Sequence, residues 1–375
     1  MQPLKLHIVS FDVPYPADYG GAIDVYYKIK SLAEAGAELY LHCYQYGRTR
    51  AEELDKWCKQ VWYYPRRTGI KGISSRLPYI VYSRRDAQLL QRLTELNAPI
   101  LFEGVHSTYF LGQPALKDRY KAIRTHNIEH DYYAQLAAKE KSFLKKTYYN
   151  TEASLLKRYE HKLDAAQGFF ALSAEDDIYF HDLYPDAEHA FIAPFHPYSS
   201  VISATGRGNY CLYHGNLSHQ ENIEAINYLL REVFSKVNVP FIVAGRNPSA
   251  QVVAACKQLP NCELIANPAT EQMEQLVKEA HIHVLPTFQT TGMKLKLLYA
   301  LFSGRHVLVN KLMLHGTDLQ ECCAIANTAN EMCNKINELM GTPFTEELIS
   351  SRASILSKQY DNKKNAAKLL TYLQH

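Results

Sequence analysis

Short apolar runs alternate with longer amphipathic segments along the first half of the chain. This alternation is typical of an α/β protein, in which a parallel sheet carries helices on both faces. Strands are predicted at Lys5–Phe11 and Leu39–Tyr44, and helices at Ala22–Ala35 and Lys139–Gln167. Three further strands are predicted on the same grounds: Pro99–Ser107, Ala122–Thr125 and Gly168–Ser173.

The alternation returns in the second half, after a segment that lacks periodicity. Pro194–Gly208 is rich in proline, serine and glycine, and it is predicted to be an interdomain linker. A chain of 375 residues is also too long for one ordinary core. We therefore expect two doubly wound domains, at 1–193 and 209–358, with a ligand between them. The linker is 194–208, and a C-terminal helix at 359–375 is expected to pack back toward the N-terminal domain.

The stretch Ile282–Asn310 has the pattern of a strand, a glycine-containing loop, a helix and another strand. The first N–H groups of a helix have no partner inside it, and the helix dipole adds positive charge there, so such a start can hold an anion. Thr291 and Gly292 lie in the loop, and Lys294 and Lys296 follow where lysines disfavour a helix. This conflict favours a ligand-binding role for the lysines. An ordinary surface position is the alternative for Lys294.

Glycines follow the first predicted strand, in the loop DVPYPADYGG. Gly20 and Gly21 would let the backbone approach a ligand closely, or they could simply meet a need for small residues. No G-x-G-x-x-G sequence follows this strand, so the common dinucleotide-binding fingerprint is missing.

Polar residues occupy the ends of two later strands. Glu103 and His106 come at the end of one, and His126, Asn127 and Glu129 follow the next. Ligands of open α/β sheets collect at the carboxyl ends of the strands, so all five residues are candidates for a cleft. A histidine there can donate or accept a hydrogen bond at neutral pH, although many single histidines are structural.

A strongly basic segment, Lys56–Arg92, contains nine Lys or Arg residues and the single acid Asp86. Aromatic residues are interleaved with these charges, namely Trp57, Trp62, Tyr63, Tyr64, Tyr79 and Tyr82. Such a face could bind an anionic membrane, a phosphorylated acceptor or single-stranded nucleic acid, or it could be a solvated basic surface. No known nucleic-acid module accompanies it, so nucleic acid is not expected as a partner.

The amino-acid composition excludes several classes of protein. Hydrophobic residues make up 47% of the chain, which argues against disorder, and the net charge of +3 does not favour nucleic-acid binding. No apolar run is long enough to cross a bilayer, and Met1 leads almost directly into a strand without a signal peptide, so a cytoplasmic location is expected. The eight cysteines are scattered without metal-ligand spacing, which predicts reduced thiols and no metal site.

Several short motifs follow one another along the chain. They are P-x-x-x-G-G at Pro16–Gly21, THNIE at Thr125–Glu129, S-x-x-D at Ser173–Asp176, YHGNLSHQENIEAI at Tyr213–Ile226, FIVAG at Phe241–Gly245, and the stretch Ile282–Asn310. Their order and spacing resemble the GT-B glycosyltransferases over nearly the whole chain, and most of all family 4 of the retaining, nucleotide-sugar-dependent enzymes. The resemblance implies two Rossmann-like domains facing a central cleft, with the acceptor side in the N-terminal domain and the nucleotide sugar in the C-terminal domain.

The resemblance also implies roles for individual residues. His126 would contact the donor sugar or its phosphate, and Lys296 would neutralise the leaving nucleotide, so these two are the catalytic candidates. The other candidates for binding the nucleotide sugar are Gly20, Gly21, Gly215, Asn216, Gly245, Arg246, Thr291, Gly292, Met293, Lys294 and Tyr299. Those for the acceptor side are Glu103, His106, Asn127 and Glu129.

The chemistry implied by the resemblance is sugar transfer with retention at the anomeric carbon. The departing phosphate helps to deprotonate the acceptor on the same face, so cations and helix N–H groups supply the main stabilisation. Neither a metal nor a cofactor is expected beyond the nucleotide sugar itself. A glycan or lipid-linked acceptor in polysaccharide or cell-surface glycan synthesis is expected. Contact of residues 56–92 with the inner face of the membrane is a hypothesis that rests on their charge, and a solvated basic face is its alternative.

Four positions depart from the family pattern. The usual pair of glutamates would fall at Thr291 and Tyr299, and a tyrosine cannot accept two hydrogen bonds as a carboxylate does. Basic ligands of the diphosphate would fall at Asn216 and near Gln220. These departures keep open a catalytically impaired, sugar-nucleotide-binding or scaffold protein. A GT-B epimerase or phosphorylase is a third and less favoured class.

Overall fold

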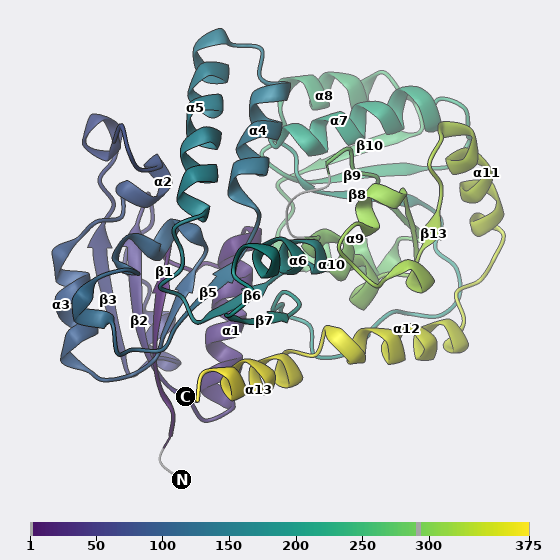
Figure 1. Cartoon of the computed structure of the whole chain (residues 1–375). Helices are drawn as coiled ribbons and strands as arrows, with labels where there is room; N and C mark the ends of the chain where they lie inside the picture. The colour runs from purple at the N-terminus through teal and green to yellow at the C-terminus, as the bar shows by residue number, and fades with distance from the viewer. Residues whose placement is uncertain (1–2, 290–293, 375) are drawn as a thin grey trace. The chain divides into compact units, whose positions relative to one another are not determined.

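The computed structural model describes residues 3–289 and 294–374, which form two compact units. Unit 1 is the chain up to Pro197 together with Gln359 to the C-terminus, and unit 2 is Tyr198–Lys358. Each unit is built around one parallel sheet with helices packed on it (Figure 1). The prediction of an α/β protein with two Rossmann-like sheets is therefore confirmed.

The sheet of unit 1 has the strand order β3-β2-β1-β4-β5-β6-β7, and every neighbouring pair is parallel. Its strands are β1 (Lys5–Ser10), β2 (Glu38–Gln45), β3 (Gln60–Pro65), β4 (Ile100–Glu103), β5 (Lys121–Thr125), β6 (Gly168–Ala171) and β7 (Glu188–Phe191). Its helices are α1 (Gly20–Glu34), α2 (Tyr79–Tyr82), α3 (Ala87–Glu95), α4 (Glu129–Lys139), α5 (Phe143–Glu160), α6 (Ala174–Leu183) and α13 (Asn362–Tyr372).

Alternating residues of β1 supply both cores of unit 1. Leu6 and Ile8 belong to the core that also contains Leu369 of α13, whereas Val9 belongs to the core on the other side of the sheet. This follows from the period of two in a strand, and it explains why β1 is apolar almost throughout, since a parallel sheet is buried on both faces. The helix α13 thus packs against unit 1, beside α1 (Figure 1).

Three predicted elements of unit 1 differ from the structure. The strand predicted at Pro99–Ser107 stops at Glu103, because Gly104 adopts φ +67° and the chain turns into a 3-10 helix. The helix predicted over Lys139–Gln167 begins only at Phe143 and ends at Glu160, because Glu140 and Ser142 are extended and separate it from α4. Strand β3 was not predicted, because its polar and aromatic residues obscure the burial of Val61 and Tyr64.

The sheet of unit 2 has the strand order β10-β9-β8-β11-β12-β13 and is parallel as well. Its strands are β8 (Cys211–Asn216), β9 (Phe241–Arg246), β10 (Cys262–Ala266), β11 (Ile282–Val284), β12 (His306–Val309) and β13 (Ala324–Ile325). Its helices are α7 (Gln220–Tyr228), α8 (Ala250–Lys257), α9 (Thr270–Glu279), α10 (Leu295–Ser303), α11 (Ala329–Met340) and α12 (Glu346–Gln359). Among the described residues, no helix combines the length and apolar character needed to cross a bilayer.

The segment 194–208 is divided between the units. Phe195 is buried in the core of unit 1, while the N–H of Ile202 donates to the carbonyl of Phe302, 2.7 Å away in unit 2. Gly206 forms an isolated antiparallel bridge with Phe344, also in unit 2. The change from one unit to the other falls between Pro197 and Tyr198.

Candidate functional site

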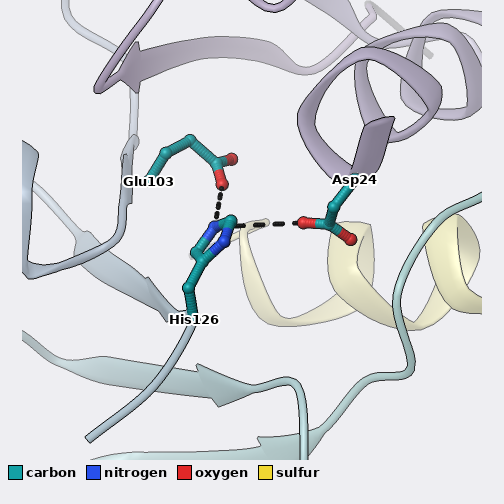
Figure 2. A group of neighbouring side chains, drawn as sticks. All are labelled: Asp24, Glu103 and His126. Atoms are coloured by element: carbon teal, nitrogen blue, oxygen red, sulfur yellow. Dashed lines mark hydrogen bonds and ion pairs between the residues drawn. The ribbon is translucent and has the colours of Figure 1, made fainter. Parts of the chain in front are cut away.

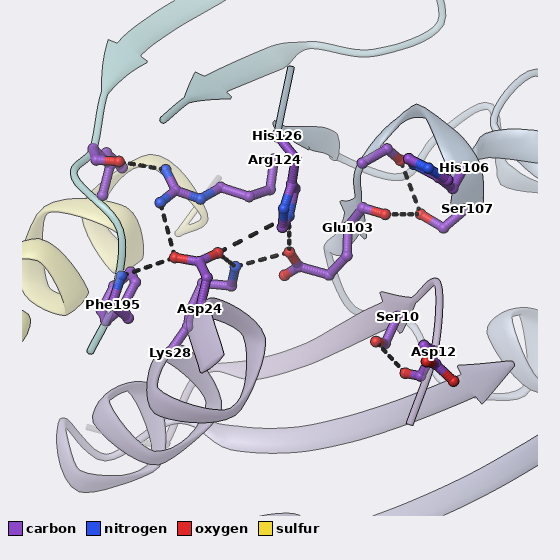
Figure 3. A network of polar contacts seen from close by, with 12 residues as sticks. Ser10, Asp12, Asp24, Lys28, Glu103, His106, Ser107, Arg124, His126 and Phe195 are labelled. Carbon is purple, nitrogen blue, oxygen red and sulfur yellow. Dashed lines mark hydrogen bonds and ion pairs between the residues drawn. The ribbon is translucent and has the colours of Figure 1, made fainter. Parts of the chain in front are cut away.

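A buried network of charged side chains lies at the carboxyl ends of β4 and β5 in unit 1 (Figure 3). Lys28 Nζ donates to Asp24 Oδ2 at 2.9 Å and to Glu103 Oε2 at 2.8 Å. Arg124 lies 3.3 Å from the other oxygen of Asp24, and His126 Nε2 lies 3.2 Å from Glu103 Oε2. Two cations thus face two carboxylates, which keeps the network balanced in charge.

The local structure explains why these residues meet. Asp24 and Lys28 are one turn apart on α1, whereas Glu103 ends β4 and His126 follows β5. Burial alone would raise the pKa of Asp24, but Lys28 and Arg124 outweigh this and hold that pKa below its ordinary value. The sequence predicted Glu103 and His126 as neighbours at the strand ends. It did not predict their partners, although Asp24 and Lys28 lie among the apolar positions of the predicted helix and were a weak signal.

Asp24, Glu103 and His126 each offer a ligand atom, and these atoms lie within 4.8 Å of one another (Figure 2). Such a set could hold a metal ion only if its centre were open to a cation. The ammonium of Lys28 already bridges Asp24 Oδ2 and Glu103 Oε2. These residues therefore do not fit a metal site, and their contacts describe a structural network that positions His126.

A second polar pair lies at the same edge of the sheet. His106 Nδ1 and Glu129 Oε1 are 3.7 Å apart, which is too long for a hydrogen bond, and neither atom has a hydrogen-bond partner among the described residues. Burial, with Glu160 nearby, raises the pKa of Glu129 to about 8, while Asn127 opposes this shift. Burial also lowers the pKa of the His106 imidazole, so burial favours the neutral form of both groups. A neutral acid facing a neutral imidazole can bind a hydroxyl group.

The glycine loop packs against an aromatic ring. Gly20 is the first residue of α1, and the preceding Tyr19 makes no side-chain capping hydrogen bond. A Cβ atom on Gly21 would lie 2.7 Å from the ring of Phe11. That ring also meets His126 edge-on, with 5.3 Å between the centroids. The structure thus gives Gly21 a packing reason to be glycine, and its proximity to a ligand stays a prediction.

In unit 2, Lys296 in the first turn of α10 is tied to the β8–α7 region. Its Nζ lies 2.6 Å from Asn222 Oδ1, 3.3 Å from the Tyr213 hydroxyl and 3.9 Å from Glu221 Oε1. Tyr213 also donates to Asn222 Oδ1 at 2.8 Å. Tyr213 and Asn222 were not predicted as site residues, although both lie in the motif Tyr213–Ile226.

Two lysines crowd the start of α10. Lys294 is its N-cap residue, and Lys294 Nζ lies 3.4 Å from the carbonyl oxygen of Gln289. Burial lowers the pKa of Lys294 to about 8; Glu221 opposes the shift and Lys296 adds to it. Burial also lowers the pKa of Lys296, again opposed by Glu221. Two partly buried ammonium groups at a helix start form an environment that an anion would stabilise.

Other predicted residues of unit 2 have structural partners. A Cβ atom on Gly245 would lie 1.8 Å from the carbonyl oxygen of Gly215, so close strand packing requires glycine at 245. Asn216 Oδ1 accepts hydrogen bonds from the N–H and the hydroxyl of Ser218 in the turn before α7. Arg246 ends β9 with an exposed side chain.

Tyr299 packs among aromatic rings. It stacks on Tyr198 with 5.5 Å between ring centroids and meets His214 edge-on at the same distance. Burial raises the pKa of its hydroxyl to about 12. The sequence left packing and ribose binding open for this residue. These contacts show that its ring packs, and ribose binding stays a prediction. The predictions for Thr291, Gly292 and Met293 lie outside the described residues.

The basic segment 56–92 is largely tied into unit 1. Arg84 is buried and donates to the carbonyl of Phe11 at 2.8 Å, while Arg66 donates to Ser83 Oγ at 3.0 Å. Arg92 forms an ion pair with Glu95 at 2.9 Å. Three exposed cations of this segment, Arg67, Lys71 and Arg76, lie in the loop after β3.

Known proteins resemble the chain along its whole length, although no protein-family model matches it. An uncharacterized 44.6 kDa protein in the cps region of Klebsiella pneumoniae is 24% identical, over 96% of this chain and 97% of its own. Arabidopsis thaliana UGT89C1, solved with UDP-L-rhamnose, has a TM-score of 0.61 at 12% identity, and the match covers 100% of both chains. A UDP-forming α,α-trehalose-phosphate synthase from Burkholderia xenovorans, solved with glucose-6-phosphate, has a TM-score of 0.60 at 12% identity over 99% of this chain and 100% of its own. These matches show that the chain has the GT-B fold.

Proposed function

We propose that the chain is a glycosyltransferase that binds the diphosphate of a nucleotide sugar at the start of α10 in unit 2. The observation that carries this proposal is the pair of partly buried lysines there, Lys294 and Lys296, whose pKa values are lowered by burial. Glu221 lies near both lysines, and a bound diphosphate would add further negative charge beside their ammonium groups. It would also accept hydrogen bonds from the first N–H groups of the helix. The fold shared with UDP-sugar-bound UGT89C1 supports the choice of ligand.

In the proposed mechanism, Lys296 stabilises the negative charge that develops on the leaving nucleotide. Asn222 and Tyr213 hold its ammonium in place, so little reorganisation is needed when the bond to the sugar breaks. Transfer proceeds with retention, and the departing phosphate takes the proton of the acceptor hydroxyl. For His126, whose Nε2 lies 3.2 Å from Glu103 Oε2, the proposal keeps the role that the resemblance implies, contact with the donor sugar or its phosphate.

On the acceptor side, the proposal assigns the hydroxyl group to the neutral pair His106 and Glu129. Within the described part of the chain, neither of the two atoms that face each other has a hydrogen-bond partner. This is costly for buried groups unless a ligand or a water molecule forms the missing hydrogen bonds. A glycan or lipid-linked acceptor would place one hydroxyl between them. The position of the Klebsiella relative in a cps region supports polysaccharide synthesis as the context.

The test is a thermal-shift screen over UDP-, GDP- and other nucleotide sugars, followed by an assay for slow hydrolysis of any sugar nucleotide that binds. The proposal expects at least one of them to raise the melting temperature, and it expects hydrolysis to be lost in Lys296→Ala. The matched control is Lys335→Ala, because Lys335 is an exposed lysine of unit 2 paired with Glu338. A full panel that gave neither a shift nor turnover would contradict the proposal.

A second candidate is a sugar-nucleotide-binding or scaffold protein without catalysis. The packing of Tyr299 on Tyr198 favours it, because this ring occupies the position where the family pattern has a ribose-binding glutamate. This candidate predicts a thermal shift without any hydrolysis or transfer. Turnover by the purified wild-type protein that disappears in Lys296→Ala would exclude it.

A further inference from the structure

The most exposed large hydrophobic side chains of the described residues lie in two segments of unit 1. Ile70, Phe143 and Leu144 are 89%, 80% and 80% exposed. Ile73 and Tyr148, in the same segments, are 62% and 42% exposed. None of these residues takes part in the mechanism proposed above. Apolar side chains gathered in this way mark an interaction surface.

The first segment is the tip of the helical hairpin formed by α4 and α5, which project together from unit 1 (Figure 1). Residues 141–148 are all exposed, from the turn through the first turns of α5. Lys141, Lys145 and Lys146 surround Phe143 and Leu144 in the sequence KSFLKK. Within residues 139–149, Glu140 is the single acid beside four lysines.

The second segment is the loop that follows β3, residues 67–76. Its Ile70 and Ile73 alternate with the exposed cations Arg67, Lys71 and Arg76, and the segment contains no acid. The short helix Gly69–Gly72 presents Ile70 almost completely to solvent. This composition repeats that of the hairpin tip.

Tyr79 connects the two segments. Its hydroxyl accepts a hydrogen bond from the N–H of Gly69 at 3.1 Å, and its own N–H donates to Glu152 Oε2 on α5 at 2.8 Å. The loop follows β3 and the hairpin follows β5, so both start from the carboxyl edge of the parallel sheet. They therefore belong to one side of unit 1.

We propose that residues 67–76 and 139–148 together form a surface that binds an anionic lipid bilayer. The isoleucine, leucine and phenylalanine side chains would enter the boundary between headgroups and acyl chains, while the lysines and arginines contact the anionic headgroups. A second copy of the chain that docked through the same surface would place cations against cations, which repel each other. Nucleic acid would leave the aliphatic side chains exposed, because they cannot stack on bases as aromatic rings do.

The location of the surface also bears on the acceptor. The hairpin begins at Glu129, so α4 links the pair His106 and Glu129 directly to the proposed bilayer surface. A helix of 11 residues spans about 16 Å. This step rests on the proposed glycosyltransferase function, and it assigns the acceptor to the class of lipid-linked molecules.

Cosedimentation of the full chain with vesicles tests the surface. One vesicle population is phosphatidylcholine alone, and the other contains about one quarter phosphatidylglycerol, at low salt. Binding to the anionic vesicles is expected to fall at least about tenfold in Phe143→Ser/Leu144→Ser. Lys145→Gln/Lys146→Gln should lose about fivefold per charge on anionic vesicles only.

The matched control is Ile178→Ser, because Ile178 is 62% exposed on α6 beside Asp177 and so presents an apolar side chain in an acidic setting. It should bind as the wild type does, and all variants should keep their melting temperatures because the altered side chains are exposed. The proposal of a bilayer-binding surface is contradicted if the wild type does not sediment with anionic vesicles. It is also contradicted if both double variants sediment as the wild type does.

Failure of the bilayer surface can be distinguished from failure of the glycosyltransferase proposal. The thermal shift caused by a nucleotide sugar should be the same in Phe143→Ser/Leu144→Ser and in the wild type, since unit 2 is unaltered. With an active preparation, the double variant should lose transfer to a lipid-linked acceptor in vesicles while its hydrolysis of the sugar nucleotide stays unchanged. Unchanged transfer to that acceptor would refute the assignment of acceptor class.

Discussion

Replacing Lys28 by methionine is expected to destabilise unit 1 strongly, although it leaves the apolar part of the side chain in place. Lys28 Nζ lies 2.9 Å from Asp24 Oδ2 and 2.8 Å from Glu103 Oε2, and all three side chains are fully buried. Breaking a buried ion pair by removing one partner costs about 3–5 kcal/mol, because the remaining charge has neither water nor a counter-ion. Arg124 still faces Asp24 in the variant, so the largest loss falls on Glu103.

The melting temperature of the purified chain gives the readout. For a unit of this size, about 3–5 kcal/mol corresponds to a fall of roughly 6–20 °C in the unfolding transition of unit 1. The matched control is Lys30→Met on the same helix, because Lys30 lies 4.0 Å from Glu34 and both side chains are more than one third exposed. An exposed pair of that kind contributes less than about 1 kcal/mol.

A double variant sharpens the test. In Lys28→Met/Glu103→Gln the uncompensated carboxylate is gone, so part of the lost stability should return, and the interaction energy can be read from the mutant cycle. The reasoning is refuted if Lys28→Met lowers the melting temperature no more than Lys30→Met does. It is also refuted if the double variant is less stable than the sum of the two single changes.

Two further predictions concern one residue in each unit. Burial raises the pKa of Glu129 to about 8, against an ordinary 4.5, so the folded chain holds this proton more tightly than the unfolded chain does. The stability that the bound proton contributes is therefore present below pH 4.5 and is lost as the pH rises toward 8. Glu129→Gln should therefore gain in melting temperature relative to the wild type between pH values of about 5 and 8.5, and a difference that does not change with pH would contradict this. Gly245→Ala should cost about 3 kcal/mol, because the new Cβ atom would lie 1.8 Å from the Gly215 carbonyl oxygen between paired strands. Gly341→Ala, whose Cβ would meet only an ordinary 3.5 Å contact, is the control, and equal urea midpoints for the two variants would contradict the prediction.

The sequence predicted the architecture well because burial on both faces makes parallel strands apolar almost throughout. The strands at Leu39–Tyr44 and Ala122–Thr125 lie within the observed β2 and β5, and Gly304 follows α10 where a helix end was expected. The errors arose where backbone geometry at single residues decides the path, as at Gly104 and in the turn between Lys139 and Phe143.

The candidate site was predicted only in part because its contacts join distant segments. Glu103 and His126 were predicted from the general position of strand ends, but Lys28 reaches Glu103 across 75 residues and Arg124 reaches Asp24 across 100. The spacing of Asp24 and Lys28 on one helix was a signal that both are buried, but a single sequence does not say which distant residues they meet. The lysines of α10 were found more readily, because they conflict with the dipole of their own helix.

Calorimetric titration with the nucleoside diphosphate of whichever nucleotide sugar binds tests the central claim most directly. The account predicts that Lys296→Met weakens binding at least about tenfold, because the variant loses one charge-assisted hydrogen bond to the diphosphate. Lys335→Met should bind the diphosphate as the wild type does. The nucleoside without phosphates should bind the wild type and Lys296→Met equally weakly. Equal affinity of the wild type and Lys296→Met for the diphosphate would contradict the account.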